Sequence, residues 1–198
     1  MSILDLLGAL CSLLATYYFT KLYRCAWIMG LIATGLNITL YWQTKIYGHI
    51  FLEGLYALTM IFGIYFWYKP ISSKPVIRSL TPKQIFSLSL MGFIGILLYG
   101  MALTVFTNSP IPFWDASTTV MSLIAQILLI SKYIQTWALW FIVDAMIATL
   151  QWQQSLPYHA LATLCYLSLA GVGYTRWQKI QQIENKKRLL ILKKISLQ

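Results

Sequence analysis

Residues 5–43 read DLLGALCSLLATYYFTKLYRCAWIMGLIATGLNITLYWQ, and residues 115–153 read DASTTVMSLIAQILLISKYIQTWALWFIVDAMIATLQWQ. A shift of 110 residues aligns the two stretches without a gap, and the match extends from 5–69 onto 115–179. Apolar identities are common in membrane segments, but both histidines of the chain pair with each other, and six of its eight tryptophans form three pairs. The sequence therefore predicts an internal repeat that is three helices long.

Length and composition favour a polytopic membrane protein. The chain has 198 residues, of which 59% are apolar and 10% are charged, whereas about 25% are charged in an ordinary soluble domain. A membrane helix needs about 20 mostly apolar residues. The predicted spans, with approximate ends, are 4–20, 26–44, 46–68, 85–106, 115–131, 135–152 and 158–178.

The predicted fold class is all-α, with seven transmembrane helices arranged as two three-helix repeats and one linker helix (3+1+3). The repeats occupy 1–69 and 115–179, the linker with the fourth helix occupies 70–114, and a basic cytoplasmic tail occupies 180–198. An even number of spans separates corresponding helices, so both copies cross the membrane in the same direction. This is a parallel repeat, and transporters built from repeats bind substrate near mid-membrane between the copies.

The distribution of charge predicts the orientation. If the N-terminus is outside, fourteen of the fifteen Lys and Arg lie inside and only Lys45 lies outside. The positive-inside rule therefore indicates an N-out/C-in topology. The net charge of +10 then reflects topogenic signals and attraction to anionic lipid. The predicted partner of these cations is the lipid bilayer, not a nucleic acid.

Two acidic residues lie at membrane depth. Asp144 is near the middle of the span 135–152, and Glu53 lies inside the span 46–68. An acidic residue at the centre of a span costs about 2.5–3.5 kcal/mol on insertion scales. Such residues normally face a cavity or a partner. The repeat places Thr163 opposite Glu53 and Thr34 opposite Asp144, so each half contributes one carboxylate.

Aromatic and polar residues share helix faces with these acids, because positions n, n+3 and n+7 lie on one side of a helix. One carboxylate from each half, with aromatic walls, suits a flat cationic ligand held by cation–π attraction of about 0.5–2 kcal/mol. The predicted substrate-binding residues are Asn37, Glu53, Tyr56, Gln126, Trp137, Trp140 and Asp144.

Other conspicuous residues have structural interpretations. Gly63 and Gly173 are expected to be close-packing contacts between helices. Tryptophans at helix ends usually mark the membrane interface. The four residues expected in this belt are Trp42, Trp67, Trp152 and Trp177.

Signatures of soluble enzymes are absent from the sequence, which contains no G-x-G-x-x-G, P-loop, H-E-x-x-H or C-x-x-C motif. The three cysteines are scattered, and His49 and His159 lie at the outer starts of predicted helices. The sequence therefore predicts neither an enzyme nor a resident cofactor or metal.

Three segments resemble motifs of the PnuC family of bacterial vitamin transporters, whose type member carries nicotinamide riboside. Residues 112–115 (PFWD) resemble the family's PFWD, and 132–144 (KYIQTWALWFIVD) resemble its KY…WxxW followed by Asn or Asp. Residues 53–67 (EGLYALTMIFGIYFW) resemble QxxY…YGWYxW. The resemblance covers approximately residues 1–178.

The resemblance implies a 3+1+3 fold related to SWEET proteins, and a multi-pass protein of the bacterial inner membrane. It implies facilitated diffusion of nicotinamide riboside, trapped in the cell by cytoplasmic phosphorylation. Carried over by motif, the residues lining the substrate site are Trp137, Trp140, Asp144 and Glu53, with Asn37 and Tyr56 as neighbours.

Glu53 departs from the family pattern, which has Gln at this position. A Gln can make two complementary hydrogen bonds to a carboxamide, whereas an ionised Glu can only accept. Thiamine, whose aminopyrimidine can pair with a carboxylate, therefore remains an alternative substrate. A SWEET-type sugar carrier and a non-transporting scaffold are weaker alternatives, and homo-oligomerisation stays open.

Overall fold

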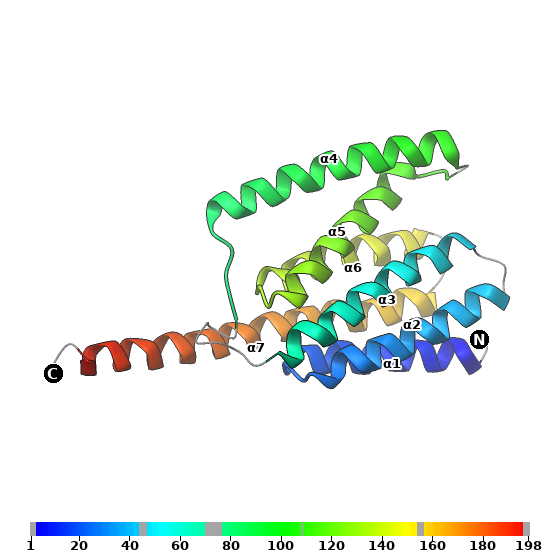
Figure 1. Cartoon of the computed structure of the whole chain (residues 1–198). Helices are drawn as coiled ribbons and strands as arrows, with labels where there is room; N and C mark the ends of the chain where they lie inside the picture. Colours follow the sequence, from blue (N-terminus) through cyan, green and yellow to red (C-terminus); the bar gives the residue numbers. More distant parts are fainter. Residues whose placement is uncertain (1–2, 44–46, 70–76, 108, 154–156, 196–198) are drawn as a thin grey trace.

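The computed structural model describes residues 3–43, 47–69, 77–107, 109–153 and 157–195. Within these residues the chain forms seven α-helices (Figure 1). They begin and end close to the predicted spans, except that the last helix continues far beyond 178. The helices are α1 (Ile3–Thr20), α2 (Cys25–Gln43), α3 (Tyr47–Tyr68), α4 (Pro82–Phe106), α5 (Pro112–Ile130), α6 (Gln135–Gln153) and α7 (Pro157–Ile195).

Two of the described helices, α4 and α5, are long and apolar enough to cross a membrane by length and composition alone. Shorter apolar stretches lie in α1, α2 and α6. Helix α4 lies apart from the other helices and packs only against α5 (Figure 1). Most of its surface is therefore exposed and apolar, including Phe86 and Phe106.

Local signals in the sequence explain where α4 begins. The Thr81 hydroxyl accepts a hydrogen bond from the Gln84 backbone N–H, and the Gln84 side chain accepts one from the Thr81 backbone N–H. This capping box satisfies amides that have no partner inside the helix. Pro82 occupies the first turn, where its missing N–H costs nothing.

The remaining six helices form two groups of three. Helices α1, α2 and α3 pack in sequence, as do α5, α6 and α7. The groups meet where α1 contacts α7 and where α3 contacts α5. These two contacts are equivalent under the shift of 110 residues. The arrangement leaves α2 and α6 on opposite sides of the space between the groups.

Tryptophan pairs of nearly equal geometry fix α2 to α3 and α6 to α7. Trp27 and Trp67 meet edge to face with ring centroids 5.4 Å apart, and Trp137 and Trp177 do so at 5.5 Å. An ideal Cβ on Gly63 would collide with the Trp27 indole, and one on Gly173 would collide with that of Trp137. The close-packing role predicted for both glycines is therefore confirmed.

Trp67 and Trp177 also tie the two groups of helices together. The indole N–H of Trp67 donates to the Ile130 carbonyl at 2.9 Å, and that of Trp177 donates to the Phe19 carbonyl at 3.1 Å. The expectation that these two tryptophans belong to an interface belt is wrong, because both are buried in the core. A bulky ring with a satisfied N–H is well suited to the centre of a helix junction.

Trp42 and Trp152 behave differently, since both side chains are exposed on the surface of the protein. They come at the opposite end of α2 and α6 from the buried pairs. Their exposure is compatible with the predicted interface belt.

The linker before α4 is pinned to the turn between α5 and α6. The Arg78 N–H donates to the Lys132 carbonyl, and the Ile134 N–H donates to the Arg78 carbonyl, both at 2.9 Å. The adjacent Ile77 side chain is buried.

Helix α7 continues past this turn to Ile195, so the predicted tail extends the last helix without a break (Figure 1).

Substitution of the glycines that face the tryptophan rings tests this packing directly. We expect Gly173→Ala to lower the melting temperature, because the added methyl group must displace the Trp137 ring. Gly171→Ala is the matched control on the same helix, since a Cβ there meets no atom within 4 Å. Thermal unfolding in detergent measures both variants, and equal melting temperatures would contradict the assigned contact.

Candidate functional site

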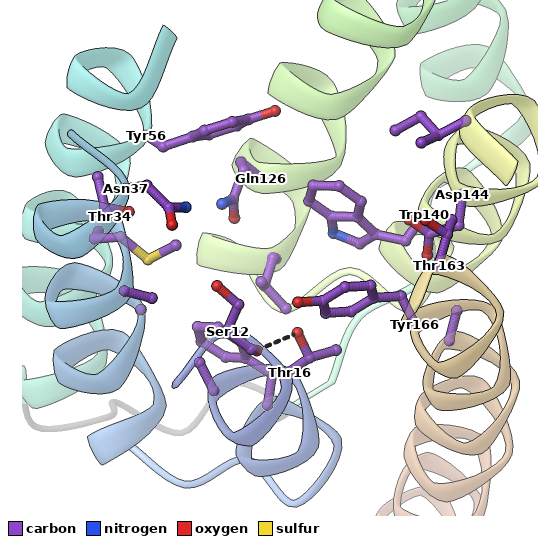
Figure 2. A pocket seen from close by; sticks show the side chains of 18 of the residues that line it. Ser12, Thr16, Thr34, Asn37, Tyr56, Gln126, Trp140, Asp144, Thr163 and Tyr166 are labelled. Atoms are coloured by element: carbon purple, nitrogen blue, oxygen red, sulfur yellow. Dashed lines mark hydrogen bonds between the residues drawn. The ribbon is translucent and has the colours of Figure 1, made fainter. Parts of the chain in front are cut away.

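A cavity of about 450 Å³ lies between the two groups of helices (Figure 2). Side chains from α1, α2, α3, α5, α6 and α7 line it. All seven residues predicted from the sequence line this one cavity: Asn37, Glu53, Tyr56, Gln126, Trp137, Trp140 and Asp144. The sequence pattern thus identified side chains that the fold brings together from four helices.

One end of the cavity is polar and lies against α2 and α3. The Asn37 side-chain amide donates to a Glu53 carboxylate oxygen at 2.9 Å. Thr34, from α2, also lines this end of the cavity. Tyr56 projects from α3 above this pair (Figure 2). Glu53 therefore presents an oriented carboxylate whose position is fixed by the neighbouring Asn37 amide.

The opposite end lies against α6 and α7. Trp140 projects toward the cavity, and Asp144 lies one turn further along the same helix (Figure 2). The Asp144 side chain is only 8% exposed. Tyr166, the repeat equivalent of Tyr56, points its hydroxyl toward the centre from α7 (Figure 2). This end combines a flat ring with a buried acid.

Besides the two acids, the halves differ at two further pairs of equivalent cavity positions. The position of Trp140 is taken by Gly30 in the first half, and the position of Met60 is taken by Ala170 in the second. A Cβ on Gly30 would come 2.8 Å from the Met60 sulfur. In the first half, the Met60 side chain therefore lies beside Gly30. In the second half, the equivalent of Gly30 is Trp140, and the indole is present instead. The cavity therefore has an aromatic platform from Trp140 at one end only.

Two buried polar atoms in the cavity wall have no hydrogen-bond partner among the described residues. They are the side-chain carbonyl oxygen of Gln126 and the indole nitrogen of Trp137. A buried polar group without a partner is costly. The Gln126 oxygen is thus available to a donor on a ligand, while the Trp137 ring is mostly occupied by its contact with Trp177.

The charges around the cavity are separated by sign. Its described lining contains two carboxylates and no Lys, Arg or His. Cations collect instead at the end of the bundle where α5 turns into α6, and the Lys132 ammonium lies 4.7 Å from the Trp67 ring centroid. Burial lowers the pKa of Lys132, and the nearby charges of Arg24 and Arg78 lower it further.

Sequence reasoning missed the contribution of α1, from which Ser12 and Thr16 line the cavity (Figure 2). The signal was available, because the repeat makes Thr16 equivalent to Gln126, which was predicted. Small hydroxyl residues are common in membrane helices and gave no separate indication. Thr34, Thr163 and Tyr166 also line the cavity. The side chains of His49 and His159 lie outside the described residues.

Comparisons with known proteins agree with this architecture. The model of the family described as "Nicotinamide mononucleotide transporter" matches residues 2–179. A curated relative, the nicotinamide riboside transporter PnuC of Neisseria mucosa, is 28% identical over 169 residues. That alignment covers 78% of this chain, and it spans 64% of the relative's length. The PnuC of Escherichia coli strain K12 is 23% identical over 76% of this chain and 74% of its own.

A solved structure, titled as the crystal structure of the vitamin B3 transporter PnuC, superimposes with a TM-score of 0.75 at 26% identity. The superposition covers 90% of this chain and 82% of the other. These relatives are named as transporters and not as enzymes. With the family model matching nearly the whole of its helical bundle, this membrane protein belongs to the PnuC family of nicotinamide riboside and nicotinamide mononucleotide transporters.

Proposed function

We propose that this protein carries nicotinamide riboside, a cationic vitamin, into the cell by facilitated diffusion. The observation that carries the proposal is the cavity itself, which joins two carboxylates and a tryptophan face and whose described lining contains no cationic side chain. A positively charged ring can stack on Trp140 by cation–π attraction, and negative charge in the cavity offsets its lost hydration. Phosphorylation in the cytoplasm would trap the vitamin, because a downhill carrier alone only equalises concentrations.

The transport mechanism we propose uses the two groups of helices as parallel three-helix repeats, 3+1+3 with α4 as the linker. Support comes from the equivalent tryptophan pairs and from the equivalent contacts α1–α7 and α3–α5. Leu22 and Lys132, which also correspond under the repeat, both take a positive φ in the turns between helices. Rocking of one repeat against the other would open the cavity to each side in turn.

Within the cavity, each of the seven predicted residues has a proposed task. Trp140 stacks on the ring, with Trp137 supporting the wall behind it. Glu53, oriented by Asn37, accepts from donors on the ligand at the opposite end. Tyr56 and Gln126 hydrogen-bond to the middle of the ligand, and Asp144 contacts the ring substituent. None of these residues acts as a nucleophile, so the ligand passes through chemically unchanged.

Thiamine is a second candidate, which the Glu53 carboxylate specifically favours. Its aminopyrimidine presents an amino donor that the Glu53 carboxylate can accept. Its thiazolium ring carries a fixed positive charge, as the nicotinamide ring of nicotinamide riboside does. Both ligands carry a positive charge on a ring, so a measurement of binding is needed to tell which of them the cavity accepts.

We place the protein in the bacterial inner membrane with its N-terminus outside and its C-terminus inside. The cations around Lys132 and along the extension of α7 would then face the cytoplasm and the anionic lipid of the inner leaflet. The exposed apolar face of α4 would contact lipid or a second copy of the chain.

Ligand binding tests the proposed function. We expect nicotinamide riboside or thiamine to raise the melting temperature, since a ligand at one hundred times its Kd adds about 2.7 kcal/mol of stability. Neutral sugars should have no effect. Trp140→Ala should reduce the shift at a fixed ligand concentration, because the ring platform is lost. Trp152→Ala is the control, since this tryptophan is 75% exposed and does not line the cavity.

A shift with sugars alone would instead favour a carrier of the SWEET type. No shift with any ligand, together with unchanged uptake in Trp140→Ala, would favour a non-transporting scaffold.

A substitution of Gln126 tests whether this residue contributes to ligand binding or to the stability of the fold. We expect Gln126→Met to leave the unfolding temperature unchanged or raise it, because it removes a buried oxygen without a described partner. The same change should weaken ligand binding measured by calorimetry, since a hydrogen-bonding group is lost. A strong loss of stability without ligand would show that Gln126 is structural.

Topology can be tested with a fluorescent protein fused to the C-terminus. We expect fluorescence, because the fusion folds in the cytoplasm if the C-terminus is inside. A fusion of alkaline phosphatase at the same position should be inactive. The reverse pair of results would contradict the N-out/C-in orientation while leaving the cavity assignment intact.

A further inference from the structure

We propose that the cavity carries a single negative charge when it binds its ligand, with Glu53 ionised and Asp144 protonated. Asp144 then donates a hydrogen bond to an acceptor group on a monocationic ligand. This inference rests on the proposed function, because it assumes that the cavity receives a cationic vitamin. It assigns opposite roles to two acids that sequence reasoning treated alike.

The first step is the charge balance of the cavity. Two carboxylates line one space of about 450 Å³, and its described lining contributes no cationic side chain. A carboxylate removed from water is costly unless it is paired, and two like charges in one enclosure raise that cost. A monocation can pair with only one of them. The other carboxylate therefore needs a proton.

The second step is the choice between the two acids. Glu53 accepts a hydrogen bond from the Asn37 amide at 2.9 Å. Donors directed at a carboxylate favour its ionised form. Asp144 is 8% exposed and has no hydrogen bond or ion pair to the part of the chain that the structure describes. The proton therefore belongs on Asp144.

The surroundings of Asp144 support this choice. Tyr56 on α3 and Tyr166 on α7 interact electrostatically with Asp144, and neither supplies a positive charge. Glu53, the other acid that lines the cavity, supplies none either. Helices α1, α2 and α5 contribute only uncharged groups to the cavity wall. These groups are Ser12, Thr16, Thr34, Asn37 and Gln126.

The consequence is a narrower class of substrate. Asp144 lies one turn from Trp140 on the same helix, so its proton would reach an acceptor attached to, or part of, the stacked ring. A carboxamide oxygen and a pyrimidine nitrogen are such acceptors. Hydroxyl or amino donors at the other end of the ligand would meet Glu53. Dications, and rings without an adjacent acceptor, would bind poorly.

Infrared spectroscopy of the protein in lipid membranes tests the protonation directly. A protonated carboxylic acid has a carbonyl band distinct from that of a carboxylate, and the chain has only five acidic residues. We expect this band at neutral pH in the wild type and in Glu53→Gln, and its loss in Asp144→Asn. Nicotinamide riboside or thiamine should shift the band without removing it. Absence of the band in the wild type, its loss in Glu53→Gln, or its removal by ligand would overturn the proposal.

Binding to the same two variants gives a second test, since both replace an acid by its amide. We expect Glu53→Gln to weaken vitamin binding about tenfold or more, because the charge-assisted partner is lost. Asp144→Asn should weaken it less, because the asparagine amide still donates. Equal losses, or a larger loss in Asp144→Asn, would contradict the assignment. If neither vitamin binds the wild type, the proposed function fails, while the infrared band still decides the protonation of Asp144.

Discussion

The main constraint on the structure is that two acidic side chains lie at membrane depth and must not face lipid. Glu53 and Asp144 lie in separate helices of separate repeats, and each would be expensive if it faced hydrocarbon. The fold directs both into one cavity, which hydroxyl, amide and aromatic groups also line. Helices α1, α2, α3, α5, α6 and α7 all contribute to its wall.

The closure depends on tryptophan. Each indole pair fills the junction of two neighbouring helices, and a glycine on the facing helix makes room for the ring. The indole N–H groups of Trp67 and Trp177 then bond to carbonyls at the ends of α5 and α1, which belong to the opposite group. One residue type thus packs each group internally and joins the two groups. These links lie at the same end of the bundle as the turns with positive φ at Leu22 and Lys132.

The departures from symmetry make the two ends of the cavity different. If the halves were identical, the cavity would bind a symmetric ligand or bind an asymmetric one in two orientations. The exchange of Gly30 and Met60 for Trp140 and Ala170 leaves a ring platform at one end only. The acids are placed unequally as well, with a donor directed at Glu53 and a more apolar setting for Asp144. A ligand with a flat ring at one end and donors at the other therefore has one preferred orientation.

The sequence alone determined the number of helices, most of their ends and seven of the residues that line the cavity. Helix ends follow from apolar length and turn residues, and the cavity residues follow from helical periodicity combined with the high cost of a buried acid, as at Asp144. The repeat could be found because rare residues such as tryptophan match at a fixed offset.

Only the tertiary structure decided what those tryptophans do. A tryptophan at a helix end is apolar along most of its ring and polar at one atom, so it suits a membrane interface and a helix junction equally well. Trp152 is exposed, whereas Trp177 is buried because the Phe19 carbonyl accepts its indole N–H and Gly173 leaves space for the Trp137 ring against which Trp177 packs. The same holds for Ser12 and Thr16, whose place in the cavity depends on α1 packing against α7, a contact between residues far apart in the chain.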